Sequence, residues 1–302
     1  MKRSVGAVVA EKTIDLIKKI PENMTIEEVI RELPETNDVP YTMPHGIVFK
    51  VPCREVKIQN MQMFVLNEKA SSKVVVIYLH GGAYVHQPTI FHWAFMERLS
   101  RKNDICVLAP IYPKAPNHTY QESYQILTQL YEEILKNGPD RKIVFMGDSS
   151  GAGLALGLGL TFPEKNLPQP QEMILFSPWV DMTLENPETY AYEAVDPMLI
   201  HEPLIAYGKA WAGETDCRDY RLSPMFGTLE NLQNITIYVG TREILYPDEV
   251  EFANRLKKAG VKHELVVGEG MNHVYPIFPI KEAKEVLEEV SHRIKRIEQE
   301  EK

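Results

Sequence analysis

The first part of the chain carries a helical pattern of apolar positions. Residues 1–33 place them at intervals of three and four, and Thr25 and Glu28 have the spacing of a capping box. Pro34 then interrupts the pattern. We therefore expect a helical N-terminal piece that is attached to the domain that follows it.

From residue 47 the pattern changes to strands. Three short segments alternate as half-exposed antiparallel strands do: Ile47–Val51, Val56–Ile58 and Gln62–Leu66. Six others are continuously apolar: Val74–Leu79, Ile105–Ala109, Ile143–Met146, Met173–Phe176, Ile235–Val239 and Glu264–Val267. Helical candidates lie between and after them: 91–101, 119–137, 151–161, 248–259 and 281–299. Continuous apolar strands that alternate with helices predict a parallel sheet covered on both faces.

One long segment interrupts the alternation. Residues 182–222 are rich in Tyr, Trp and Pro and lie between two predicted core strands. An insertion there would lie over the carboxyl ends of the strands, where open α/β sheets bind ligands. The prediction is one α/β domain over residues 1–302, with a lid formed by about 1–45 and 182–222.

Composition excludes several classes of protein. The 302 residues are 44% hydrophobic and 25% charged, and 33 Lys and Arg against 42 Asp and Glu give a net charge of -9. Nucleic-acid binding needs a basic face, so a nucleic acid is not an expected partner. Three isolated cysteines predict neither a disulfide framework nor a zinc site. No apolar run approaches the length of a membrane span, and we expect a cytoplasmic protein.

The pentapeptide Gly147–Gly151 contains the strongest chemical signal. It has the form G-x-S-x-G around Ser149, follows an apolar strand and precedes a helical segment. In that context the motif describes a sharp turn that exposes a nucleophilic serine at a helix N-terminus. A glycine-rich turn with a capping serine, or a phosphate cradle, is the alternative.

A second glycine motif follows the predicted strand Val74–Leu79. Gly81 and Gly82 come after His80 and before Ala83, so their backbone amides can approach a ligand closely. An oxyanion hole requires such amides. A tight turn without chemistry is the alternative explanation.

Together these motifs resemble the hormone-sensitive-lipase-like carboxylesterases of the α/β-hydrolase superfamily. Further similar segments follow in the same order: 111–116, 177–181, Asp196-Pro197 and 268–273. The resemblance covers about residues 45–290, and it departs from the family at Ala83, Ser150 and Asn117. It implies a mostly parallel eight-stranded sheet flanked by helices, with a helical lid.

A serine hydrolase of this fold needs an acid and a histidine after the serine in the chain. His273 lies in a glycine-rich turn after the last predicted strand, on the same sheet edge as Ser149. Many relatives carry Asp-x-Leu in the preceding loop, and this motif aligns with Glu243 to Leu245. Asp248 is the rival acid, although capping-box spacing with Glu251 explains it by itself.

The predicted function is hydrolysis of small or short-acyl esters by Ser149, Glu243 and His273, through an acyl-enzyme. Oxyanion contacts are expected from the loop and elbow positions Gly81, Gly82, Ala83 and Ser150, and pocket contacts from Tyr84, His86, Tyr207 and Trp211. Packing of the lid explains its aromatic residues equally well. No cofactor or metal is expected. Dimerisation through an edge strand is common in such enzymes, and the sequence leaves a homodimer as an open alternative.

Two alternatives stay open. The same residues can cleave an amide, formyl or acetyl group on a metabolite. A non-catalytic small-molecule receptor on this fold is the more remote alternative, because known receptors of this type have lost the histidine that this sequence keeps at 273.

Overall fold

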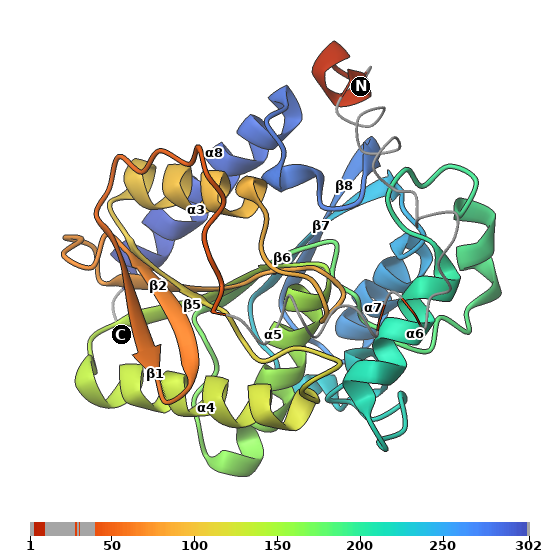
Figure 1. Ribbon diagram of the computed structural model, residues 1–302, viewed down its shortest axis with the longest axis horizontal. Coiled ribbons are helices and arrows are strands. Elements are labelled where there is room, and N and C mark those ends of the chain that lie inside the picture. Colours follow the sequence, from red (N-terminus) through yellow and green to blue (C-terminus); the bar gives the residue numbers. More distant parts are fainter. Residues whose placement is uncertain (1–2, 10–27, 29, 31–39, 301–302) are drawn as a thin grey trace.

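The computed structural model describes residues 3–9, 28, 30 and 40–300. At its centre is an eight-stranded sheet with the order β1-β2-β4-β3-β5-β6-β7-β8 (Figure 1). The strands are β1 Cys53–Ile58, β2 Met61–Leu66, β3 Val74–Leu79, β4 Cys106–Pro110, β5 Lys142–Asp148, β6 Glu172–Phe176, β7 Ile235–Arg242 and β8 His263–Asn272. β2 pairs antiparallel with β1 and with β4, and all pairs from β4 to β8 are parallel.

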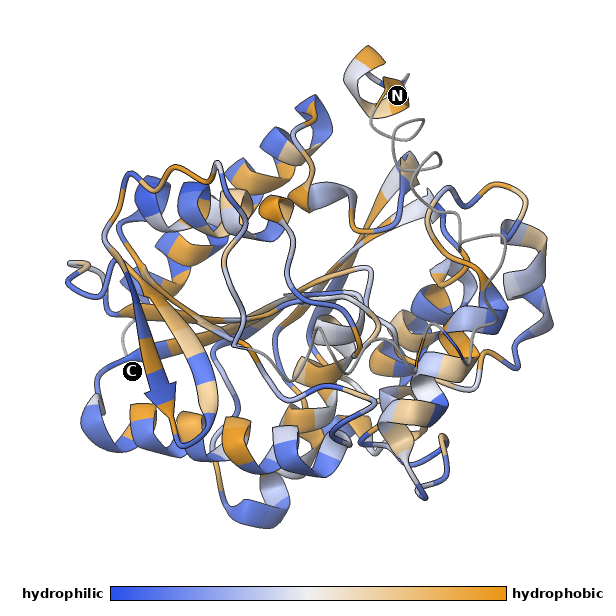
Figure 2. Cartoon of the chain, viewed as in Figure 1, coloured by the Kyte–Doolittle hydropathy of each residue, from blue (hydrophilic) through white to orange (hydrophobic). Residues whose placement is uncertain are grey.

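Helices cover both faces of this sheet. They are α3 Ile90–Asn103, α4 Tyr120–Asn137, α5 Ser150–Thr161, α6 His201–Ala212, α7 Tyr246–Lys258 and α8 Lys281–Gln299, with short 3-10 turns between them, among them η2 Pro187–Tyr192 and η5 Tyr275–Ile277. Figure 2 shows hydrophobic residues along the central strands and a mixture of both kinds on α4 and α8. Helices with one buried face have this mixture.

Alternate side chains of the parallel strands enter two separate hydrophobic cores. Val75 and Ile77 of β3 belong to the core that contains residues of α4 and α5. Val74 and Val76 belong to the core beneath α3 and α8. This burial on both faces explains why the parallel strands read as continuous apolar runs.

The predicted α/β-hydrolase fold is confirmed. The prediction was wrong only about individual elements. Ile47–Val51 forms no strand; instead Phe49 packs edge-on against Trp93, with ring centroids 6.3 Å apart. The predicted start of α7 is also wrong, because Leu245 is the N-cap and Asp248 is the third residue of the helix. The proposed cap at Thr25 lies outside the described residues, as does most of the segment 1–45.

The insertion 182–222 contains η2 and α6 and no strand. It lies beyond β6 and beside the carboxyl ends of the parallel strands, at the right of Figure 1. None of the helices in the described part of the chain combines the length and the apolar composition that crossing a membrane requires.

Candidate active site

Ser149 occupies the sharp turn between β5 and α5. Its φ of 53° and ψ of -122° lie in a region that non-glycine residues rarely adopt. The surrounding backbone fixes this conformation, because the Ser149 amide donates to the carbonyl of Phe176 at 2.8 Å. A Cβ at Gly151 would lie 2.1 Å from the carbonyl oxygen of Leu79. Glycine at 151 therefore allows α5 to start directly against β3.

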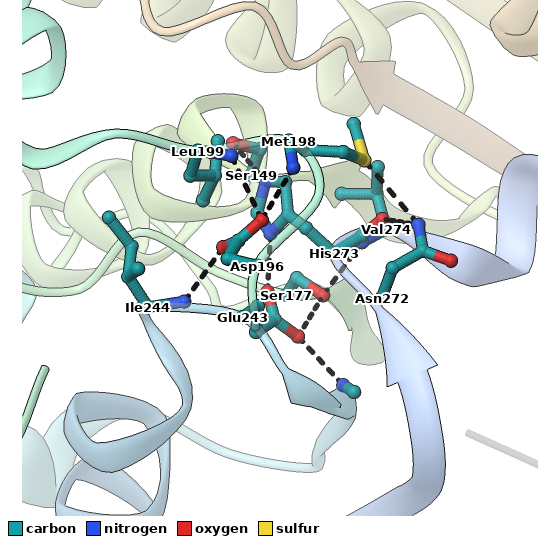
Figure 3. Close-up of polar contacts among 11 residues, drawn as sticks. Ser149, Ser177, Asp196, Met198, Leu199, Glu243, Ile244, Asn272, His273 and Val274 are labelled. Atoms are coloured by element: carbon teal, nitrogen blue, oxygen red, sulfur yellow. Dashed lines mark hydrogen bonds and ion pairs between the residues drawn. The ribbon is translucent and has the colours of Figure 1, made fainter. Parts of the chain in front are cut away.

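The structure brings His273 and Glu243 to this serine (Figure 3). Nε2 of His273 lies 2.9 Å from Oγ of Ser149, and Nδ1 is hydrogen-bonded to Oε2 of Glu243. Glu243 follows β7 and His273 follows β8, so both come from the sheet edge that also carries Ser149. All three side chains are buried. The arrangement has the geometry of a nucleophile, a base and an acid that orients the base.

The second oxygen of Glu243 is held by two donors. Oε1 accepts the backbone amide of Gly240 at 2.7 Å and the hydroxyl of Ser177 at 2.8 Å. The Ser177 oxygen in turn accepts the amide of Val274 at 3.0 Å. Sequence reasoning missed this role of Ser177, although its position directly after β6 places it on the edge that carries the site.

The pKa of His273 is raised above its ordinary value. Burial alone lowers the pKa of this imidazole, but the charge and the hydrogen bond of Glu243 outweigh it, with help from Asp196 and Asp148. The imidazolium is therefore stabilised where it would form after proton transfer from Ser149.

Asp248 is directed elsewhere. Its Oδ1 accepts a hydrogen bond from the side-chain amide of Asn186 at 2.7 Å, while Glu243 occupies Nδ1 of His273. Burial raises the pKa of Asp248 to about 6. The geometry thus favours Glu243 as the acid and leaves Asp248 between α7 and the inserted segment.

Asp196 joins the inserted segment to the loop of Glu243 (Figure 3). One carboxylate oxygen accepts the amides of Met198 at 2.7 Å and Leu199 at 2.9 Å, and the other accepts the amide of Ile244 at 2.8 Å. The motif Asp196-Pro197 was recognised in the sequence, but its function as a connector was not. Through Asp196 the residues above the serine are tied to the loop that holds the acid.

The loop after β3 approaches the site because Asp148 anchors it. A Cβ at Gly81 would lie 2.2 Å from Oδ2 of Asp148, so only glycine fits there. The Asp148 carboxylate also accepts the Tyr78 hydroxyl at 2.8 Å and lies 3.2 Å from Nε2 of His92. Burial raises the pKa of Asp148, but His92, Tyr78 and a backbone hydrogen bond from Gly81 outweigh it and the net shift is downward.

This contact changes the expected set of oxyanion donors. Since the backbone of Gly81 is hydrogen-bonded to Asp148, Gly81 positions the loop. The remaining candidates are the amides of Gly82, Ala83 and Ser150. Gly82 has a φ of 121° and Ala83 a φ of 52°, and both line the cavity beside Ser149. These left-handed conformations turn the backbone of the loop at the point where donors are needed.

A mainly apolar cavity of about 560 Å³ surrounds Ser149. Its described lining includes His86 and Tyr207, as expected, and Met198, Leu199 and Leu204 of the inserted segment. Tyr84 and Trp211 are not among the described lining residues, which corrects two expectations. Their rings stack on each other in the core, with centroids 4.7 Å apart and planes 3° apart.

No group of three or more His, Cys, Asp or Glu side chains is arranged to hold a metal ion among the residues that the structure describes. The polar groups around Ser149 are instead engaged with one another, through His273, Glu243 and Ser177 on one side and Asp148 with His92 on the other. The arrangement is suited to acyl transfer by a serine.

Comparisons with known proteins agree with this geometry. A family profile described as α/β hydrolase fold matches residues 76–277. An esterase of Acinetobacter venetianus is 30% identical over 80% of this chain and 81% of its own length. An acetyl-hydrolase of Streptomyces hygroscopicus is 27% identical over 68% of this chain and 70% of its own.

Solved structures show the same fold. A candidate esterase from Staphylococcus aureus has a TM-score of 0.86 at 26% identity, covering 95% of this chain and 99% of its own. An esterase from the bacterial hormone-sensitive lipase family has a TM-score of 0.83 at 23% identity, covering 98% and 99%. The resemblance inferred from the sequence motifs is confirmed, and the chain belongs to the α/β-hydrolase family.

Proposed function

We propose that this protein is a serine carboxylesterase that cleaves small or short-acyl esters through an acyl-enzyme on Ser149. Carboxylic ester hydrolysis as the reaction class follows from the family and from relatives named as esterases. The hydrogen-bonded series from Ser149 through His273 to Glu243 is the observation that carries the finer proposal.

The reaction begins with proton transfer. His273 takes the proton of Ser149 through Nε2 as the serine oxygen attacks the ester carbonyl. Glu243 holds the other ring nitrogen in its protonated tautomer and stabilises the imidazolium. His273 then donates the proton to the leaving alcohol oxygen. A water molecule, deprotonated by the same imidazole, releases the acid and restores Ser149.

Backbone amides stabilise the charge that develops on the carbonyl oxygen. We assign this role to Gly82, Ala83 and Ser150, since Gly82 and Ala83 line the cavity and Ser150 begins α5. The helix N-terminus adds a partial positive charge at the same place. Loss of one such donor typically lowers kcat by about 10²–10³.

The size and lining of the cavity favour a substrate with a small apolar acyl group. At about 560 Å³ it also has to hold the alcohol part, and much of its lining is apolar, including Leu199, Leu204 and Ile277. The inserted segment 182–222 supplies part of this lining and acts as a lid in this proposal. The acetyl-hydrolase among the relatives agrees with a short acyl group.

Hydrolysis of p-nitrophenyl esters from acetate to decanoate by wild type and by Ser149→Ala tests the proposal. We expect a short-chain optimum and a loss of at least about 10⁴ in kcat in the variant. Matched anilides distinguish an amidase, which would hydrolyse them at comparable rates. Activity that survives in Ser149→Ala would contradict the assignment of the nucleophile. Tight binding without turnover by wild type would favour a receptor.

A further inference from the structure

A second cavity lies directly beside the one that surrounds Ser149. It is an outer groove of about 270 Å³ between the segment around residue 47, the start of α3 and the end of η5. Phe91 and Ile277 line both cavities. The two spaces therefore lie on opposite sides of the same two side chains.

Phe91 is the aromatic member of this shared wall. It stands edge-on to Phe278, with centroids 5.1 Å apart and planes 72° apart. Phe278 is buried, whereas Phe91 is 36% exposed. Phe278 holds one edge of the Phe91 ring, and the partly exposed ring separates the cavity around Ser149 from the outer groove.

The chemistry of the proposed reaction indicates which part of the ester faces this partition. His273 must deliver a proton to the leaving oxygen, so the alcohol part lies on the histidine side of Ser149. The residues that follow His273 continue the cavity wall from Val274 to Ile277 and Phe278. An alcohol chain that lengthens along this wall reaches Phe91.

The outer groove is suited to an apolar chain. Besides Phe91 and Ile277 it is lined by Val48 and Ile90, which are 75% and 41% exposed. Its two charged residues have partners: Glu97 pairs with the guanidinium of Arg101 at 2.8 Å, and Nε of Arg98 donates to the carbonyl of Ala94 at 3.0 Å. These side chains give an alkyl chain an apolar surface against which it can be removed from water.

We propose that Phe91 sets the longest alcohol group the enzyme accepts, and that the outer groove is a latent subsite for a longer alcohol chain. This inference rests on the proposed esterase function. Removal of the Phe91 side chain joins the two cavities and gives additional methylenes an apolar surface. Each buried methylene raises kcat/KM by about fourfold until the groove is filled.

The test compares methyl, butyl and octyl butyrate, with acid release followed by titration. For Phe91→Ala we expect the octyl-to-methyl ratio of kcat/KM to rise about tenfold or more over wild type. Ile90→Ala widens the outer groove but leaves the partition in place, so its ratio should remain that of wild type. The double variant Phe91→Ala/Ala94→Phe refills the groove and should reverse the gain.

A series of p-nitrophenyl esters with different acyl chains locates the partition. Its profile should be the same in wild type and Phe91→Ala. A shift toward longer acyl chains without any change in the alkyl butyrate series would place Phe91 on the acyl side and overturn the inference. An unchanged ratio in both series would also overturn it.

Binding of 1-octanol, measured by calorimetry, tests the partition without turnover. Phe91→Ala should bind 1-octanol more tightly than wild type, with 1-butanol bound equally by both. Equal affinity for 1-octanol would contradict the subsite. If wild type hydrolysed none of the esters, the proposed function would fail, and the calorimetry would still decide whether the groove is reachable from the cavity.

Discussion

Ser177 donates its hydroxyl proton to Oε1 of Glu243 at 2.8 Å, and it accepts the amide of Val274, the residue after His273. One side chain thus connects the acid with the loop that carries the base. Ser177 is itself not among the described residues that line the cavity, and its hydrogen bonds go to Glu243 and to the backbone of Val274, so we regard it as a positioning residue.

Ser177→Ala should therefore lower kcat while KM stays close to the wild-type value. Removal of a hydrogen bond to a charged group costs about 1.5–3 kcal/mol, which corresponds to a decrease in kcat of about 10- to 100-fold if the bond acts only on the orientation of Glu243. Steady-state kinetics checks the split between kcat and KM. A variant with unchanged kcat would show that Gly240 alone positions the carboxylate.

Two conservative substitutions distinguish the acids. Glu243→Gln keeps the shape of the side chain but loses the charge that orients His273, and kcat should fall by about 10⁴. Asp248→Asn should stay within about threefold of wild type, because Asp248 contacts Asn186 and lies away from Nδ1 of His273. A large loss of kcat in Asp248→Asn with little loss in Glu243→Gln would make Asp248 the acid.

The rate should depend on pH through the raised pKa of His273. The base acts in its neutral form, so kcat/KM falls as the pH decreases through a pKa above the ordinary 6.5. In Glu243→Gln the largest remaining effect is burial, which lowers the pKa, and the acidic limb should move to lower pH. Rates measured between about pH 5 and 9 in both proteins provide the check. An acidic limb at the same pH in both proteins would contradict the effect of Glu243 on the pKa of His273.

Trp211 and Tyr207 were both expected in the pocket, but the structure places only Tyr207 there, so their substitutions should have opposite effects. Trp211 is 1% exposed and stacks on Tyr84, so Trp211→Ala should cost about 3–5 kcal/mol of stability while the acyl-chain optimum is kept. Tyr207 lines the cavity, and Tyr207→Ala should change the chain-length profile. Denaturant unfolding and the ester series are measured side by side. An altered chain-length optimum in Trp211→Ala would argue that Trp211 shapes the pocket after all.

Lys114 should make the stability of the fold depend on pH. Burial lowers the pKa of this amine to about 7, and its Nζ donates to the carbonyl of Tyr112 at 3.0 Å. Between this value and the ordinary lysine pKa of 10.5 the unfolded chain binds a proton that the folded chain has released, so wild-type stability rises with pH. The cost of the buried charge is fully present below pH 7.

Lys114→Met removes this dependence. Its stability advantage over wild type should be largest near pH 6 and should shrink by on the order of 2 kcal/mol by pH 9. Unfolding in denaturant at both pH values measures the difference. An advantage that is the same at pH 6 and pH 9 would show that Lys114 keeps its proton in the folded state.

Local signals were sufficient to predict most of the site. Ser149 stands in a strand–turn–helix motif that contains glycines. Gly151 is required because it lies directly against the carbonyl of Leu79, and such a requirement is visible in the sequence. Glu243 and His273 directly follow the last two strands. Because these strands are parallel to the strand before Ser149, all three residues lie at the same end of the sheet. The parallel strands were predicted because burial on both faces gives continuous apolar runs.

The errors concern orientation and pairing, which depend on distant parts of the chain. Tyr84 and Trp211 follow pocket-like patterns, but the face of α6 that meets the core is decided by stacking of Trp211 on Tyr84, whose ring also stacks on Trp179. Ile47–Val51 alternates like a strand, yet the sheet ends at β1. Phe49 of this segment packs against Trp93 instead. Ser177 donates one hydrogen bond and accepts another, and Asp196 accepts three backbone amides; such contacts leave no periodic signal in the sequence.

The separation of the nucleophile and its base along the chain has a consequence for biosynthesis. His273 follows Ser149 by 124 residues, and it is positioned only when β8 has paired with β7. A nascent chain on the ribosome therefore carries Ser149 without His273 beside it for at least the next 124 residues of its elongation. In the proposed mechanism turnover requires His273, so recovery of activity during refolding should report the pairing of β8 with β7.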